Sequence, residues 1–252
     1  MKTMQISIRV LAFFALTGVL LTAACKKDKS GTYTGATTNY LGSELSTYVT
    51  TDEDGKPDEI GITIPEAAFN SFDALSGDVS WSLPFPTEHN ETPFVHMWAG
   101  YNPHGHEPMG IYDKPHFDFH FYLTSEAERM TISPFDTIAG AKPLPAGELP
   151  ANYINAGLVP TMGTHWVDVT SPEFNGQPFT ETFIFGSFDG KLTFYEPMIT
   201  KAFIAAQQNF EKDIPAVTTY AQSGKYYPTK LGFQHDTSAK TYRVYLRGFV
   251  KR

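Results

Sequence analysis

Apolar and polar positions alternate along many short stretches of this chain, and turn-forming residues separate these stretches. A period of two residues is typical of strands whose two faces differ in environment. We predict strands at 59–64, 79–83, 94–101, 116–123, 165–169, 183–188, 191–195 and 242–250. The pair Asp189-Gly190 between two of these runs favours a type I′ hairpin, because both of its residues tolerate positive φ. The pattern therefore predicts a mainly β protein, with α+β as the alternative, built on an antiparallel sheet or sandwich.

Two stretches depart from this alternation and predict helices. Apolar side chains recur every three or four residues from Ile199 to Phe210, and Pro197 suits the first position of a helix. We predict a helix over 197–213 on this basis. A shorter helix is predicted to begin at Ser125, because acidic residues follow it at once.

The N-terminal end has the pattern of a secretory leader. Residues 1–24 combine a positively charged start with an apolar run, and small residues then precede Cys25, the only cysteine of the chain. The sequence Leu-Thr-Ala-Ala-Cys over 21–25 resembles a bacterial lipoprotein signal, in which the cysteine is lipidated and becomes the first mature residue. The alternative is an ordinary cleaved leader with an incidental cysteine. The resemblance implies a membrane partner through lipid on Cys25, and Lys26 in place of an aspartate favours the outer membrane.

The remaining chain divides by composition at about residue 57. Residues 25–57 are rich in Ser, Thr, Gly and Lys, and they predict a tether that could include a first strand. Residues 58–252 show no internal repeat and no break in composition, which predicts one β-rich domain. Within it, the proline-rich stretch 141–160 predicts a long ordered loop.

Charge and composition exclude several classes of function. The 252 residues include 19 Lys and Arg and 27 Asp and Glu, so the formal net charge is −8. No basic cluster is present, which argues against nucleic acid as a partner. An aromatic content of 14% with only 18% charged residues argues against disorder. A homo-oligomer is compatible with the sequence.

Histidines are concentrated in one part of the chain. Five of the eight fall within a window of 25 residues, namely His96, His104, His106, His116 and His120. Neutral imidazole is the commonest metal ligand in proteins, and imidazoles mixed with carboxylates suit zinc, iron, copper or nickel. The sequence therefore predicts a site for a divalent metal, with zinc as the default.

The run Pro-His-Phe-Asp-Phe-His-Phe-Tyr over 115–122 alternates strictly. In a strand, His116, Asp118 and His120 share one face, and the phenylalanines share the other face and should belong to the core. Residues four apart in a strand are about 13 Å apart, so His116 and His120 cannot both bind one ion from a straight strand. Either the strand bends, or one of the two histidines has another role. Asp118 could orient an imidazole or act as a catalytic base, and the alternative is an exposed polar face with no ligand.

Three further side chains are candidate ligands. His106 lies beside Glu107 on a loop that also carries His104, and we prefer His106 as the ligand. His165 shares a strand face with apolar residues, so it is either a ligand or a core histidine. Glu196 ends an apolar strand face, where burying a carboxylate costs free energy unless it is paired or bound to metal. The alternative is that Glu196 is an exposed cap at the start of a helix.

Four blocks of sequence resemble a known family. They are residues 101–108, 115–122, 162–168 and 196–200, with the motifs HGHEP, PHFDFHFY, MGxHWVD and EPMIT. They resemble a family of uncharacterised bacterial secreted or lipid-anchored proteins that is catalogued as a domain of unknown function. The resemblance spans residues 58–210 and implies no reaction, but it groups the same histidines and glutamate.

These observations lead to one leading hypothesis and two rivals. The leading hypothesis is a lipid-anchored, extracytoplasmic protein with a mononuclear metal site, which activates water for hydrolysis of an ester, amide or similar bond. Its ligands are predicted to be His106, either His116 or His120, His165 and Glu196. The first rival is a non-catalytic metal-binding or scaffold lipoprotein. The second is a carbohydrate-binding module, which would need Trp98 and Trp166 exposed on one surface.

Overall fold

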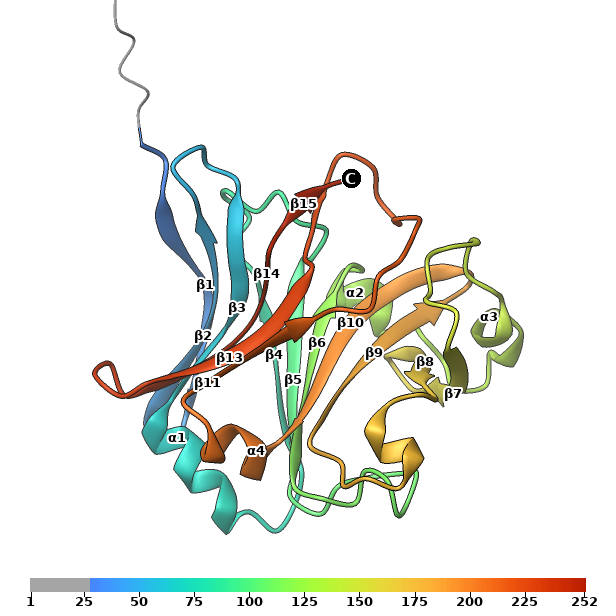
Figure 1. Ribbon diagram of the computed structural model, residues 1–252, viewed down its shortest axis with the longest axis horizontal. Helices are drawn as coiled ribbons and strands as arrows, with labels where there is room; N and C mark the ends of the chain where they lie inside the picture. The colour runs from blue at the N-terminus through green and yellow to red at the C-terminus, as the bar shows by residue number, and fades with distance from the viewer. Residues whose placement is uncertain (1–27) are drawn as a thin grey trace, which may run out of the picture.

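Two antiparallel sheets pack face to face in this protein (Figure 1). The computed structural model describes residues 28–252, so the predicted leader and Cys25 lie outside the described residues. The six-stranded sheet has the order β1 (Gly31–Tyr40), β2 (Ser43–Thr51), β3 (Pro57–Pro65), β14 (Thr241–Arg247), β13 (Lys230–Asp236) and β11 (Asn209–Asp213). The seven-stranded sheet has the order β4 (Val79–Pro84), β5 (His96–Asn102), β6 (His116–Tyr122), β10 (Lys191–Thr200), β9 (Glu181–Phe188), β8 (Gly163–Asp168) and β7 (Tyr153–Val159). The prediction of a mainly β protein with antiparallel sheets is confirmed.

Helices are short and lie at the ends and edges of the sheets (Figure 1). They are α1 (Glu66–Ser71), the 3₁₀ helix η1 (Phe72–Ala74), α2 (Glu126–Arg129), α3 (Thr137–Ala141), the 3₁₀ helix η2 (Pro172–Asn175) and α4 (Lys201–Ala206). A small ribbon of β12 (Tyr226–Tyr227) and β15 (Val250–Lys251) lies near the C-terminus. Among the described residues, no helix combines the length and the apolar character that crossing a bilayer requires.

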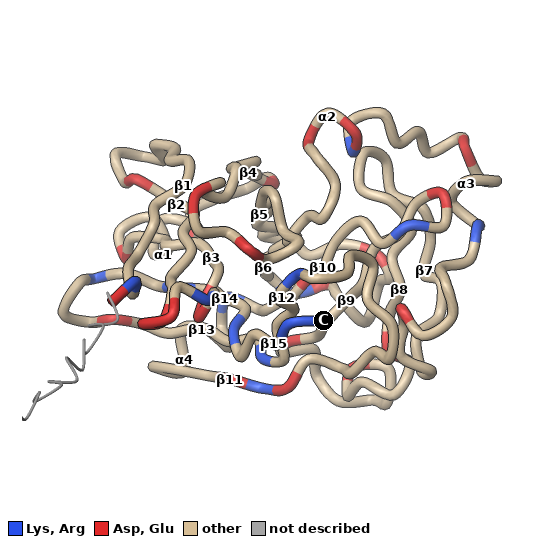
Figure 2. Tube along the Cα trace, turned by 90° about the horizontal axis from the view of Figure 1, so that it is seen from above, with Lys and Arg blue, Asp and Glu red and all other residues tan. Residues whose placement is uncertain are grey.

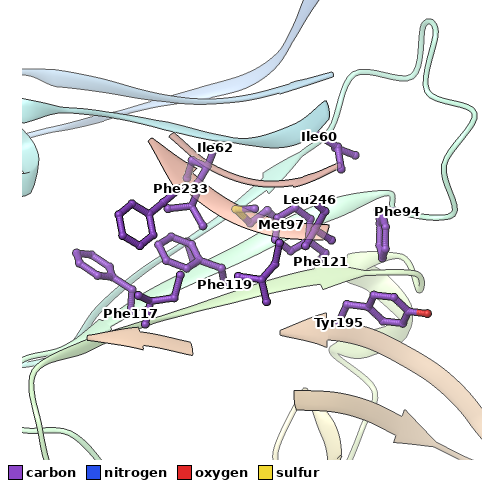
Figure 3. Close-up of a cluster of buried hydrophobic side chains, with 14 of the residues drawn as sticks. Ile60, Ile62, Phe94, Met97, Phe117, Phe119, Phe121, Tyr195, Phe233 and Leu246 are labelled. Atoms are coloured by element: carbon purple, nitrogen blue, oxygen red, sulfur yellow. The ribbon is translucent and has the colours of Figure 1, made fainter. Parts of the chain in front are cut away.

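The main core lies between the two sheets. Phe117, Phe119 and Phe121 of β6 are at most 1% exposed, and they point toward Ile62 and Phe233 of the opposite sheet (Figure 3). The phenylalanine face of β6 is therefore core, as the alternation predicted. Because successive side chains of a strand point to opposite faces, the polar residues of β6 project from the other face of the seven-stranded sheet.

That other face is also covered. A second cluster of buried side chains lies on it, consisting of Tyr112, Tyr122, Val167, Phe179, Ile184, Phe194 and Met198. As a result, His116 is 0%, Asp118 5% and His120 1% exposed. The alternative of an exposed polar strand face is thereby excluded.

The predicted helix over 197–213 is wrong in most of its length. Strand β10 continues to Thr200, α4 covers only residues 201–206, and β11 begins at Asn209. Pro197 lies inside β10, and the ladder between β6 and β10 has no pair at Glu196 and Pro197, because proline has no N–H to donate. The helical spacing was produced by a strand, a six-residue helix and a second strand in succession.

Other local predictions can be compared directly with the structure. The helix after Ser125 is confirmed as α2, with a capping box between Ser125 and Glu128. The hairpin turn is confirmed as well, since Asp189 and Gly190 have φ values of 49° and 71°. The stretch 25–57 contains two strands, β1 and β2, where a tether with at most a first strand was predicted. The predicted loop 141–160 contains β7.

Charged residues of both signs are distributed over the six-stranded sheet (Figure 2). Arg247 of β14 pairs with Glu211 of β11, and Lys230 of β13 pairs with Asp213 at 2.6 Å. Exposed pairs of this kind add little stability, so the fold depends mainly on its two apolar clusters.

Candidate metal centres

The structure divides the six candidate side chains into two groups of three. The inner group is His120 of β6, His165 of β8 and Glu196 of β10. The outer group is His106 of the β5–β6 loop together with His116 and Asp118 of β6. Within each group, one possible ligand atom from each residue lies within 4.8 Å of the others. The predicted single site with ligands from His106 to Glu196 is therefore replaced by two neighbouring groups, and His116 and His120 belong to different ones.

Strand register brings the inner group together. Tyr195 pairs with Phe121 and Met198 with Asp118, so the same register places Glu196 opposite His120. The distance from His120 Nε2 to Glu196 Oε1 is 3.4 Å, and that from His165 Nε2 to Glu196 Oε2 is 3.6 Å. The carboxylate thus lies between two imidazoles from different strands.

Phe194 supports both inner histidines. Its ring centroid is 4.5 Å from that of His120 and 4.9 Å from that of His165. It occupies this position because residue 186 is glycine, where a Cβ would meet the Phe194 ring at 2.1 Å. The glycine of β9 therefore lets an aromatic ring pack beneath the ligands.

Burial strongly affects the protonation of the inner group. It lowers the pKa of His165 to about 4 and, with the neighbouring His165, holds the pKa of His120 well below its usual value. Burial and the charge of Asp118 raise the pKa of Glu196 well above its usual value. Without a cation the group is therefore most stable with neutral imidazoles and a protonated Glu196. A cation in the same place would favour the carboxylate and leave the imidazoles neutral, as metal ligands must be.

The outer group has a different charge state. Burial raises the pKa of Asp118, but the facing imidazoles of His106 and His116 outweigh this effect and hold it well below its usual range. Burial lowers the pKa of His106, but the Asp118 carboxylate outweighs it and raises that pKa above its usual value. Asp118 is therefore a negative charge within this buried face.

The spacing of the ligand atoms fits a metal better than it fits hydrogen bonds. A tetrahedral ion with bonds of about 2.1 Å places its ligand atoms about 3.4 Å apart. The nitrogen-to-oxygen distances are 3.4 and 3.6 Å in the inner group, and 3.1 and 3.5 Å in the outer group. Charge-assisted hydrogen bonds between such atoms are usually about 2.7–2.9 Å, and of the four distances only the 3.1 Å one falls within the wider range of N–H···O bonds. The residues present thus form groups that could bind a metal.

One cavity connects the two groups. Its volume is about 410 Å³, and its polar lining includes His106, Asp118, His120, His165 and Glu196. Apolar residues supply most of the remaining wall, namely Trp98, Met162, Val167, Ile184 and Met198. No Lys or Arg is among the described residues that line it.

Asn102 is a site residue that was not predicted from the sequence. Its side-chain nitrogen donates a hydrogen bond to Asp118 Oδ2 at 2.6 Å. Asn102 is paired in register with His116, because the loop that carries His106 joins β5 to β6 as a hairpin. The signal was available, since a residue that opens a hairpin loop must lie near the residue that closes it.

The other histidines lie away from both groups. His96 is 3% exposed and its ring stacks on Tyr122 at a centroid distance of 4.6 Å, so it packs as a buried structural side chain. His104 is exposed, and His89 lies in an exposed turn. His235 is half-buried, and its Nε2 lies 3.4 Å from a carboxylate oxygen of Glu66.

The two tryptophans of the carbohydrate hypothesis lie on opposite faces of the sheet. Trp166 packs against the main core, and its ring nitrogen donates to Ser187 at 2.8 Å. Trp98 packs against the second cluster beside the cavity. They do not form one exposed surface, so the condition set for a carbohydrate-binding module is not met.

Comparison with known proteins adds no relative: no family model, curated protein or solved structure matches the chain. The resemblance of the four sequence blocks stays a prediction, and the function must be inferred from the geometry of the two groups.

Proposed function

We propose that this protein is a metal-dependent hydrolase of the bacterial cell envelope, in which the inner group holds the catalytic cation. The observation that supports the proposal is the donor set of His120, His165 and Glu196, whose nearest nitrogen-to-oxygen distances match those around a tetrahedral ion. Two histidines and one glutamate with a free fourth position are a common catalytic zinc site in hydrolases. A site closed by four protein ligands would instead favour the non-catalytic alternative.

The chain's own residues would position the cation and the substrate. Register between β6 and β10 holds the Glu196 carboxylate opposite His120, and the bond from His165 Nδ1 to the Gly163 carbonyl, at 3.1 Å, directs Nε2 of that ring toward Glu196. A divalent cation bound there would activate water and polarise a carbonyl group. Zinc is the default cation, because nitrogen and oxygen ligands in a three-residue set suit it, and iron is the main competitor.

The cavity indicates the class of substrate. Its apolar wall fits an acyl or aromatic group, and its polar floor fits a scissile ester or amide. Among the lining residues that the structure describes, there is no Lys or Arg to bind an anionic group. We therefore favour small apolar esters or amides over highly charged substrates.

Hydrolysis should depend on both the metal and Glu196. The full chain, purified in detergent without a His tag and stripped with a chelator, is assayed with p-nitrophenyl esters and anilides before and after addition of Zn²⁺ or Fe²⁺. We expect turnover only with metal, faster with longer acyl groups, and reduced at least about 100-fold in Glu196→Gln. The exposed Glu88→Gln is the matched control and should keep full activity. Metal-dependent turnover that survives Glu196→Gln would contradict the proposal.

Localisation rests on Cys25 and is tested separately. We expect cells that express the full chain to attach an alkyne analogue of palmitate to it, because Cys25 is the only thiol available. Cys25→Ser should abolish labelling and release the protein from the outer-membrane fraction. Labelling that persists in this variant would contradict the lipid anchor and leave the metal site unaffected.

A further inference from the structure

The outer group is assembled from one strand and one loop. His116 and Asp118 are two residues apart on β6 and therefore project from the same face. The loop brings His106 back over them, and the His106 backbone N–H donates to the Tyr112 carbonyl at 3.0 Å, which closes the loop. The His106 and His116 rings are 4.6 Å apart and nearly perpendicular, at 75°.

Hydrogen bonds direct all three side chains toward one point. Nδ1 of His116 lies 2.7 Å from the Lys114 carbonyl, and Nδ1 of His106 lies 2.7 Å from the Glu107 carbonyl. A carbonyl oxygen only accepts hydrogen bonds, so both Nδ1 atoms carry hydrogen, and each neutral ring presents the lone pair of Nε2. These lone pairs face Asp118, which Asn102 holds in place.

Two buried atoms in this arrangement have no hydrogen-bond partner. They are His116 Nε2 and Asp118 Oδ1, which face each other at 3.1 Å. Their side chains are 0% and 7% exposed, so water does not compensate them freely. A neutral imidazole and a carboxylate that face each other in this way present lone pairs to one another, which is unfavourable unless a positive charge lies between them.

We propose that the outer group is a second metal centre, in which His106, His116 and Asp118 bind a divalent cation of their own. This goes beyond the proposed function, which requires only the inner group. Carbonyl partners on ligand Nδ1 atoms and an amide partner on a ligand carboxylate are the usual supports of a metal site. One cation would satisfy both unpartnered atoms at once.

The two centres would bind separate ions. They share no residue, and Asp118 and His120 are two residues apart on β6, a spacing of about 6.7 Å along a strand. No described carboxylate belongs to both groups, so neither ion is bridged to the other by protein. His106 is 40% exposed, whereas all three inner ligands are at most 15% exposed, so the outer ion should exchange faster.

Stoichiometry with Zn²⁺ tests this proposal. The full chain, purified in detergent without a His tag, is stripped with a chelator, titrated with Zn²⁺, desalted and analysed for metal and protein. We expect two Zn²⁺ per chain in the wild type and one in His106→Ala. His106 lies on a loop and is partly exposed, so this variant should fold normally, and circular dichroism checks that it does. Asp118→Asn should also bind one, whereas the exposed His104→Ala on the same loop is the matched control and should bind two.

Each result separates this proposal from the proposed function. The second centre would be overturned if His106→Ala and Asp118→Asn each still bound two Zn²⁺. It would also be overturned if the wild type bound a single Zn²⁺ that Glu196→Gln removes. Both outcomes would leave the inner centre in place. In the second case, the outer group is an ion pair of imidazolium and carboxylate. One Zn²⁺ that is lost in His106→Ala but kept in Glu196→Gln would support the outer centre and contradict the proposed function. No bound Zn²⁺ would overturn both.

Discussion

Glu196→Gln should make the metal-free protein more stable at pH 8 and should remove the stabilisation that Zn²⁺ provides through the inner group. Burial and the charge of Asp118 raise the folded-state pKa of Glu196 well above 4.5, its usual value. In the unfolded chain the carboxyl loses its proton above pH 4.5, so the contribution of Glu196 to stability is present below that pH and is lost as the pH rises. Glutamine has nearly the same shape and no charge, and its amide can donate to an imidazole Nε2.

The effect of metal has the opposite sign. A cation that binds only the folded state at 1,000 times its dissociation constant adds about 4 kcal/mol to the free energy of unfolding. The wild-type carboxylate can give up its proton to make room for the cation, whereas the amide of glutamine supplies no charge. We therefore expect the variant to be the more stable protein with a chelator and the less stable one with Zn²⁺.

Urea unfolding at pH 5 and pH 8, with chelator and with Zn²⁺, measures both effects. The comparison is made in a His106→Ala background, so that Zn²⁺ binds only the inner group. The exposed Glu88→Gln should change the free energy of unfolding by less than about 0.5 kcal/mol under all four conditions. A metal-free Glu196→Gln protein that is less stable than the wild type at pH 8 would show that Glu196 supports the fold rather than a cation.

The outline of the site could be predicted because β6 contains half of it. The strict alternation over 115–122 placed His116, Asp118 and His120 on one face and three phenylalanines on the other, and both faces are as expected. His116 and His120 belong to different groups, as their separation along a straight strand requires. These conclusions needed only the geometry of one strand.

The division into two groups could not be predicted, because it depends on contacts between distant elements. Glu196 joins His120 through the register of β10 on β6, and His106 joins His116 through the path of a loop. Neither register nor loop path is encoded in the local spacing of residues. Asp118 was predicted to orient an imidazole or to act as a base. An orienting carboxylate would accept a hydrogen bond from Nδ1, but the Nδ1 atoms of His106 and His116 already bond to backbone carbonyls. The Asp118 carboxylate instead faces the Nε2 atoms of these rings, where a third metal ligand would lie.

The error at 197–213 has a related cause. The apolar residues from Ile199 to Phe210 lie in three different elements: Ile199 is buried in β10 between two neighbouring strands, and Phe203 lies in α4. Phe210 lies in β11 of the six-stranded sheet, where it stacks on Phe233 of β13, and both Phe203 and Phe210 are only partly buried. Their spacing coincides with a helical period, and Pro197 is compatible with β10 only because the ladder to β6 is interrupted there. Tertiary packing overrides a local pattern of this kind.

Phe119→Ala should lower the free energy of unfolding by about 3–5 kcal/mol, because it removes an aromatic ring from the centre of the main core. Phe119 is 0% exposed, stacks on Phe117 at 5.5 Å and lies among side chains of both sheets (Figure 3). It lies between Asp118 and His120 in sequence but points away from both metal groups.

Urea denaturation in excess chelator measures the core alone, because no cation then contributes to stability. Phe135→Ala is the matched control, since its ring is 90% exposed and its loss should cost less than about 0.5 kcal/mol. A decrease in the free energy of unfolding of less than about 1 kcal/mol for Phe119→Ala would mean that this face of β6 does not pack against the six-stranded sheet. The placement of His116 and His120 on the opposite, buried face would then be wrong as well.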